Sequence, residues 1–100
     1  SILEIETVIL FKIKAWLDLN DRKSSGEQVD SRSIKKHKND VFRLLANVSP
    51  STRVETAKEI QKDVAQFIDL IHEDKPDLKN LKIRDSTLDD LLVILKNIFL

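Results

Sequence analysis

Several residue types that shape small proteins are absent, or nearly so, from this chain of 100 residues. It contains no cysteine, which excludes disulfides and thiolate metal sites. One glycine and two prolines are too few for a turn-rich β fold and favour helices. No apolar run approaches the about 20 residues that a membrane span requires. We therefore expect a helical protein of the cytoplasm that has no membrane partner.

Charge is balanced, because 17 Lys and Arg residues are matched by 17 Asp and Glu residues. A net charge of zero gives the whole molecule no preference for nucleic acid, so only a local cluster could bind it. One hundred residues suit one domain with a modest core. We expect residues 1–100 to form a single helical domain. Because the chain starts with Ser and enters its most hydrophobic segment almost at once, we expect it to be cut from the C-terminal part of a larger protein.

The most hydrophobic segment runs from Val8 to Leu19, and nine of its twelve residues are apolar. It is too long for one strand, so it predicts a helix with others packed around it. The exceptions are Lys12, Lys14 and Asp18. Lys14 and Asp18 are four residues apart and can pair on a narrow exposed stripe. Lys12 projects from an otherwise apolar face, where a lysine must reach the surface or meet an anion.

A second helix is expected after Asp30 or Ser31, either of which is a good N-cap. It should end at Ser49-Pro50-Ser51, because proline disfavours helical geometry in the residue before it. The residues before the first helix, 1–7, could form a short strand or a lead-in. The apolar positions expected to face the core from the second helix are Ile34, Val41, Leu44, Leu45 and Val48.

A third helix should begin near Glu55 and carry an apolar stripe to Ile71. Residues 72–77 break it, and residues 78–83 are expected to form a single helical turn that places Leu78 and Leu81 against the core. Ser86 is expected to cap the last helix, with Asp89 completing a capping box. The sequence thus predicts an all-α fold, a compact bundle of four main helices with room for a short fifth.

The densest cluster of positive charge lies on the second helix, at Arg32, Lys35, Lys36 and Lys38. Such a cluster is either a solvated helix face or a weak nucleic-acid-binding surface, since no second basic helix or interleaved aromatic residue supports it. His37 and Asp40 are three apart, but no third ligand lies nearby, so we expect no metal site.

Asp40 borders the apolar stripe of the second helix. It could form a salt bridge with Lys12 or Arg43, or it could be a carboxylate that positions a phosphate-binding lysine. The chain has no glycine-rich phosphate loop. It also has no catalytic triad, paired catalytic carboxylates or activated nucleophile, so it is not a complete active site.

The pattern around these residues resembles the C-terminal half of AbiEii-type nucleotidyltransferases. These bacterial proteins belong to the polymerase-β-like superfamily, and many are toxins of toxin–antitoxin or phage-abortive systems. The family has a Lys-x-x-Ala helix followed, across a loop, by a helix that carries an Asp. Lys12-Ile13-Lys14-Ala15 matches the first part and Asp40 the second, although Asn39 replaces the basic residue that most members carry there. The resemblance covers about the first half of the chain.

The resemblance implies that this chain is a helical domain facing a catalytic domain outside it. Lys12 and Lys14 would then face a nucleoside triphosphate across the cleft, and Asp40 would orient the lysine or the substrate. Magnesium would be bound by the catalytic domain, and the acceptor would be RNA or protein. This chain alone would be inactive.

A second hypothesis is a helical interaction module that binds a protein partner, or weakly RNA, without catalysis. An apolar groove between the third and fourth helices, or the exposed end of the first, would then hold the partner. The position of Lys12 separates the hypotheses: proximity to Asp40 on an open face favours the cleft, and a Lys12 in bulk water favours the module.

Overall fold

The computed structural model describes residues 4–49 and 51–100, and this part of the chain contains four α-helices and no strand. Their order is α1 (Ile5–Ser24), α2 (Ser31–Leu45), α3 (Lys58–Ile71) and α4 (Leu88–Phe99). The all-α prediction and the four-helix bundle are confirmed. Residues 1–3, which were expected to form a strand or a lead-in, lie outside the described residues, and residues 5–7 are already helical.

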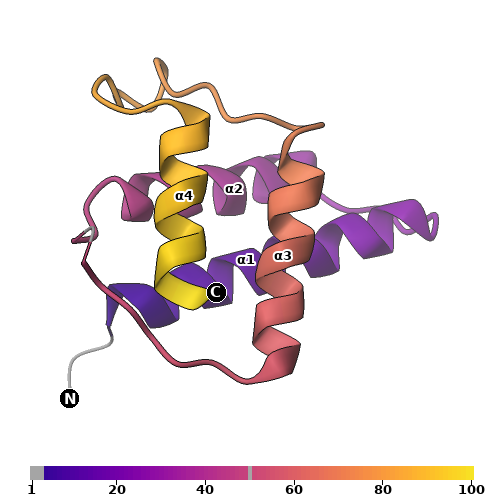
Figure 1. Cartoon of the computed structure of the whole chain (residues 1–100). Coiled ribbons are helices and arrows are strands. Elements are labelled where there is room, and N and C mark those ends of the chain that lie inside the picture. The colour runs from indigo at the N-terminus through magenta and orange to yellow at the C-terminus, as the bar shows by residue number, and fades with distance from the viewer. Residues whose placement is uncertain (1–3, 50) are drawn as a thin grey trace.

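The helices form two antiparallel pairs that cross one another (Figure 1). One pair is α1 and α2, which pack side by side, and α3 and α4 run across them. Helix α3 packs on α1, and α4 packs on both α2 and α3. Each helix thus buries one face against the other pair.

The core is one cluster of buried apolar side chains contributed by all four helices and by the segment before α4. Phe67 lies at its centre, with its ring 5.1 Å from that of Trp16 in an edge-to-face arrangement and 6.0 Å from that of Phe42. Such aromatic pairs stabilise the core by more than the burial of their surface area alone. Other fully buried side chains include Ile9, Ile13, Val41, Leu45, Val64, Ile71, Leu91, Leu95, Ile98 and Phe99.

Helix α1 extends beyond Leu19, where the hydrophobic segment ends, and it is less enclosed than the sequence predicts. It ends at Ser24, where the amides of Gly26 and Glu27 donate back to the carbonyls of Lys23 and Arg22. This pattern requires a left-handed residue, and Gly26 supplies it with a φ of 92°. The prediction that other helices surround α1 is wrong, because Phe11 is 66% exposed on the side that α2 and α3 leave open.

Helix α2 begins where the sequence indicates but ends earlier. The carboxylate of Asp30 accepts a hydrogen bond from the Arg32 amide at 2.9 Å. This backbone hydrogen bond, assisted by the Arg32 side chain, lowers the pKa of Asp30. The helix ends at Leu45, before the expected stop at Ser49, and Pro50 lies outside the described residues.

The beginnings of α3 and α4 differ slightly from prediction. Helix α3 starts at Lys58 rather than near Glu55. Helix α4 is capped by Thr87, whose hydroxyl accepts from the Asp90 amide at 3.1 Å while the Asp90 carboxylate accepts from the Thr87 amide at 2.9 Å. The capping box is therefore real but lies one residue after the predicted pair.

The single helical turn expected over residues 78–83 is present. The amide of Leu81 donates to the carbonyl of Asp77, and Lys82 then adopts a left-handed conformation with a φ of 61°. The Ile83 amide donates back to Leu78, which closes the turn as a helix end does. As expected, Leu81 is buried and Leu78 packs against the core.

Candidate functional site

The structure brings Lys12 and Asp40 together between α1 and α2. Lys12 Nζ lies 3.1 Å from Asp40 Oδ2, and each side chain is 21% exposed. The other carboxylate oxygen, Oδ1, lies 3.6 Å from Arg43 Nη1. Asp40 therefore has a cation at each oxygen, and it holds Lys12 at the edge of the core, with one side still open to solvent.

His37 lies one helical turn before Asp40 and adds an uncharged group to this pair. Its buried Nδ1 has no hydrogen-bond partner in the part of the chain that the structure describes. Burial lowers the pKa of His37 below the ordinary value of 6.5, and the positive charge of Lys12 lowers it further against the opposing effect of Asp40. The imidazole is thus kept neutral near pH 7.

Lys14 does not lie with Lys12 and Asp40. Two residues rotate an α-helix by about 200°, so the two lysines leave α1 on different sides. Lys14 Nζ donates to Asp63 Oδ2 on α3 at 3.1 Å. The predicted pair of Lys14 with Asp18 is wrong, because Asp18 pairs with Arg22 at 3.3 Å instead.

The predicted basic cluster is divided by the fold. Lys35 and Lys36 are exposed, and Arg32 is exposed but bound to its own cap residue, Asp30, at 3.3 Å. Lys38 is only 6% exposed and pairs with Asp74, from the segment after α3, at 2.8 Å. A side chain buried in an ion pair cannot join an open basic face, so Lys38 is separate from the other three.

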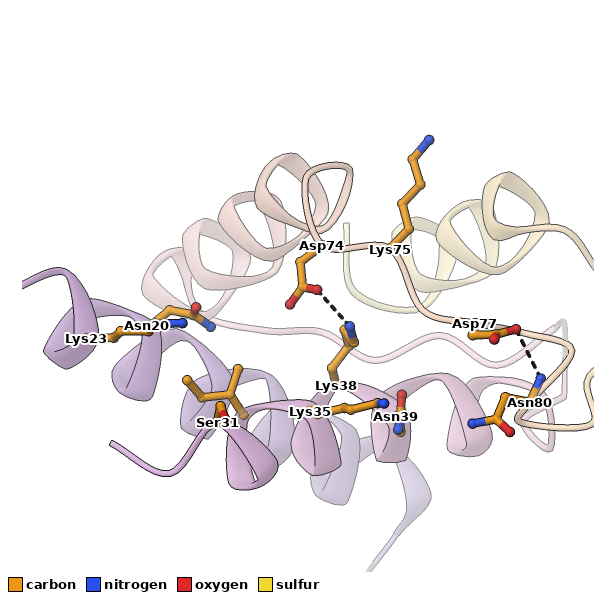
Figure 2. Close-up of a pocket in the computed structure, with 11 residues that line it drawn as sticks. Asn20, Lys23, Ser31, Lys35, Lys38, Asn39, Asp74, Lys75, Asp77 and Asn80 are labelled. Carbon is orange, nitrogen blue, oxygen red and sulfur yellow. Dashed lines mark hydrogen bonds and ion pairs between the residues drawn. The ribbon is translucent and has the colours of Figure 1, made fainter. Parts of the chain in front are cut away.

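The polar pocket around Lys38 was not expected from the sequence. It has a volume of about 410 Å³ and lies between the end of α1, the first turns of α2 and the segment after α3. Figure 2 shows Lys38 rising from α2 toward Asp74, with Asn39 beside it and Asp77 and Asn80 on the opposite wall. The only signal was that Lys38 fills a gap in the apolar stripe, between Ile34 and Val41.

A metal-binding cluster and a membrane-spanning helix are both absent from the part of the chain that the structure describes. Within residues 4–49 and 51–100, no group of three His, Asp or Glu side chains could hold a metal ion. No helix in the same ranges has the length and apolar character needed to cross a membrane.

Comparisons of the chain with protein-family models, with curated proteins and with solved structures found no match. The similarity to AbiEii-type nucleotidyltransferases therefore rests on the sequence pattern alone.

Proposed function

We propose that this chain is the helical domain of a nucleotidyltransferase and closes the nucleotide and acceptor cleft opposite a catalytic domain outside the chain. The observation that carries the proposal is the ion pair of Lys12 and Asp40 at 3.1 Å. These two residues match the Lys and Asp of the AbiEii-type pattern, and they lie 28 residues apart in the sequence on two different helices.

The chemistry of the pair suits phosphoryl transfer. Negative charge spreads over phosphate oxygens during transfer, and a cation fixed beside them stabilises that charge. Asp40 limits the conformations of Lys12, so the lysine side chain loses less conformational entropy when the nucleotide binds. Because the lowered pKa keeps His37 neutral, the imidazole adds no further positive charge beside Lys12 and Asp40.

Lys14 has a smaller role in this proposal than the sequence gives it. Its contact with Asp63 turns it toward α3, so Lys12 is the lysine that faces the nucleotide. Magnesium would be bound by the catalytic domain, as the resemblance implies. No step assigned to this chain involves the metal.

A protein-interaction module is the second candidate function. A shallow groove of about 570 Å³ lies along the start of α3, where Ala65 and Leu100 line it together with Lys58, Glu59, Gln61 and Lys62. Leu100 is 41% exposed there, and Phe11 is exposed on α1. Neither Lys12 nor Asp40 lines this groove.

A nucleotide-incorporation assay tests the first proposal. We expect no incorporation by this chain alone and incorporation by the larger protein that contains it, with each of the four nucleoside triphosphates offered in turn. Incorporation by the chain alone would contradict the division into two domains. A larger protein that is inactive with all four nucleotides, but retains a protein partner through α3 and Leu100, would favour the interaction module.

A further inference from the structure

We propose that the pocket around Lys38 binds a phosphate monoester. The pocket is separate from the Lys12–Asp40 pair, because Lys38 and Asp40 are two residues apart on α2 and leave it about 200° apart. Neither Lys12 nor Asp40 lines the pocket. The inference therefore does not depend on the proposed nucleotidyltransferase function.

Lys38 is the first reason for an anionic ligand. Lysine is almost never buried to this degree unless it is paired, and Lys38 is 6% exposed. Its ammonium group has three N–H donors, and the structure gives it one partner, Asp74 Oδ1 at 2.8 Å. Oxygen atoms of a bound phosphate would accept from the remaining donors.

Lys23 and Lys35 are the second reason. They line the pocket from α1 and α2, and neither forms an ion pair with any other described residue. In Figure 2, Lys35 extends along α2 toward Asn39, whereas Lys75 points away from the other lining residues. Three lysine residues from two helices therefore line one hollow.

The two carboxylates of the pocket are already engaged. Asp74 accepts from Lys38, and Asp77 Oδ1 accepts from the backbone amide of Asn80 at 3.1 Å (Figure 2). Asp77 thus stabilises the turn before α4. Only Asp74 competes with a ligand for Lys38. The side-chain amides of Asn39 and Asn80 add neutral hydrogen-bonding groups to the lining.

The size and charge of the pocket favour a monoester over a diester. A volume of about 410 Å³ falls at the small end of ligand sites, which span roughly 300–1,000 Å³. A phosphate monoester carries a charge of about −1.5 to −2 at pH 7 and three terminal oxygens. A diester, such as an internal RNA phosphate, has one charge and two such oxygens, so it would satisfy fewer of the three lysines.

The test is a titration of the ¹⁵N-labelled chain with methyl phosphate and with dimethyl phosphate at constant ionic strength, followed by NMR. We expect saturable shifts of the Lys35, Lys38, Asn39 and Asn80 amides with methyl phosphate, and binding at least about fivefold weaker with dimethyl phosphate. Shifts that centre on Lys12 instead, or that do not saturate, would overturn the proposal.

Two variants of neighbouring residues separate the pocket from general electrostatic attraction. Lys35→Gln should weaken methyl phosphate binding about five- to tenfold, because it removes one charged donor. Lys36→Gln removes the same charge from the next residue of α2, which does not line the pocket, and should change binding by less than about twofold. Equal weakening by both would contradict the assigned site.

The variant Asp74→Asn distinguishes a phosphate-binding Lys38 from a Lys38 whose ion pair only stabilises the fold. Removing the negative charge of Asp74 frees Lys38 for the ligand, so methyl phosphate should bind several-fold more tightly to the folded variant, even though its thermal stability falls. Circular dichroism would establish that the variant is folded. Unchanged or weaker binding by the folded variant would count against Lys38 as a phosphate ligand.

Discussion

Lys12 and Lys14 are two residues apart on α1, so their side chains leave the helix on different sides and contact different helices. Lys12 meets Asp40 on α2, where both side chains are 21% exposed. Lys14 meets Asp63 on α3, where the lysine side chain is 69% exposed. The two ion pairs have the same length, 3.1 Å, but they differ in how much water surrounds them. The pair with less water should be the stronger one.

Double-mutant cycles test this difference at the residue scale. We expect a coupling energy of about 1 kcal/mol between Lys12→Met and Asp40→Asn, measured by urea unfolding. The matched cycle of Lys14→Met and Asp63→Asn should give less than about 0.5 kcal/mol, because the exposed pair is screened by solvent. A larger coupling for the Lys14 pair would contradict the burial that the structure assigns to Lys12.

His37 predicts a dependence of stability on pH. Its pKa is lower in the folded protein than the ordinary 6.5, so below that pH the unfolded chain binds a proton that the folded chain resists. The free energy of unfolding should therefore fall as the pH drops through 6.5 toward the lowered pKa. Urea unfolding at pH 7.5 and 5.5 should show a smaller fall for His37→Gln than for the wild type. An equal fall in the two proteins would show that other groups cause it.

At the scale of the element, local rules identify the candidate caps of a helix but do not choose between neighbouring ones. Asp30 was expected to cap α2, and it does so through the Arg32 amide. The sequence around α4 offers Ser86 with Asp89 and Thr87 with Asp90 at the same spacing, so a local rule cannot decide between them. The structure uses the second pair, because the hydrogen bonds of the capping box join Thr87 and Asp90.

Alanine substitutions distinguish the two candidate caps of α4. Thr87→Ala should lower the free energy of unfolding by about 1 kcal/mol, because the Asp90 amide loses its acceptor. Ser86→Ala should change it by less than about 0.5 kcal/mol, because the Asp90 amide donates to Thr87 and not to Ser86. Thermal unfolding of the two variants provides the measurement. A larger effect at Ser86 would place the cap where the sequence alone suggests.

At the scale of the whole molecule, the sequence predicts the number and rough extent of the helices because each apolar stripe and each break is local. It cannot predict which helix covers another. Phe11 looks like a core residue in the sequence, yet it is exposed because α2 and α3 pack on other sides of α1. The burial of Lys38 depends on Asp74, 36 residues away, which no local pattern identifies. The position of Asp40 at the edge of an apolar stripe allowed a salt bridge with Lys12 or with Arg43, and the structure contains both.

We propose that Lys12, held by Asp40, acts on the phosphates of a nucleotide. The value of kcat/KM for nucleotide incorporation by the proposed larger protein tests this most directly. We expect Lys12→Gln to lower kcat/KM by about 10²- to 10³-fold, because it removes a fixed cation from the site of charge development. Lys14→Gln removes the same charge two residues away and should lower it by less than about threefold. Equal losses in the two variants, or no loss in Lys12→Gln, would contradict the claim.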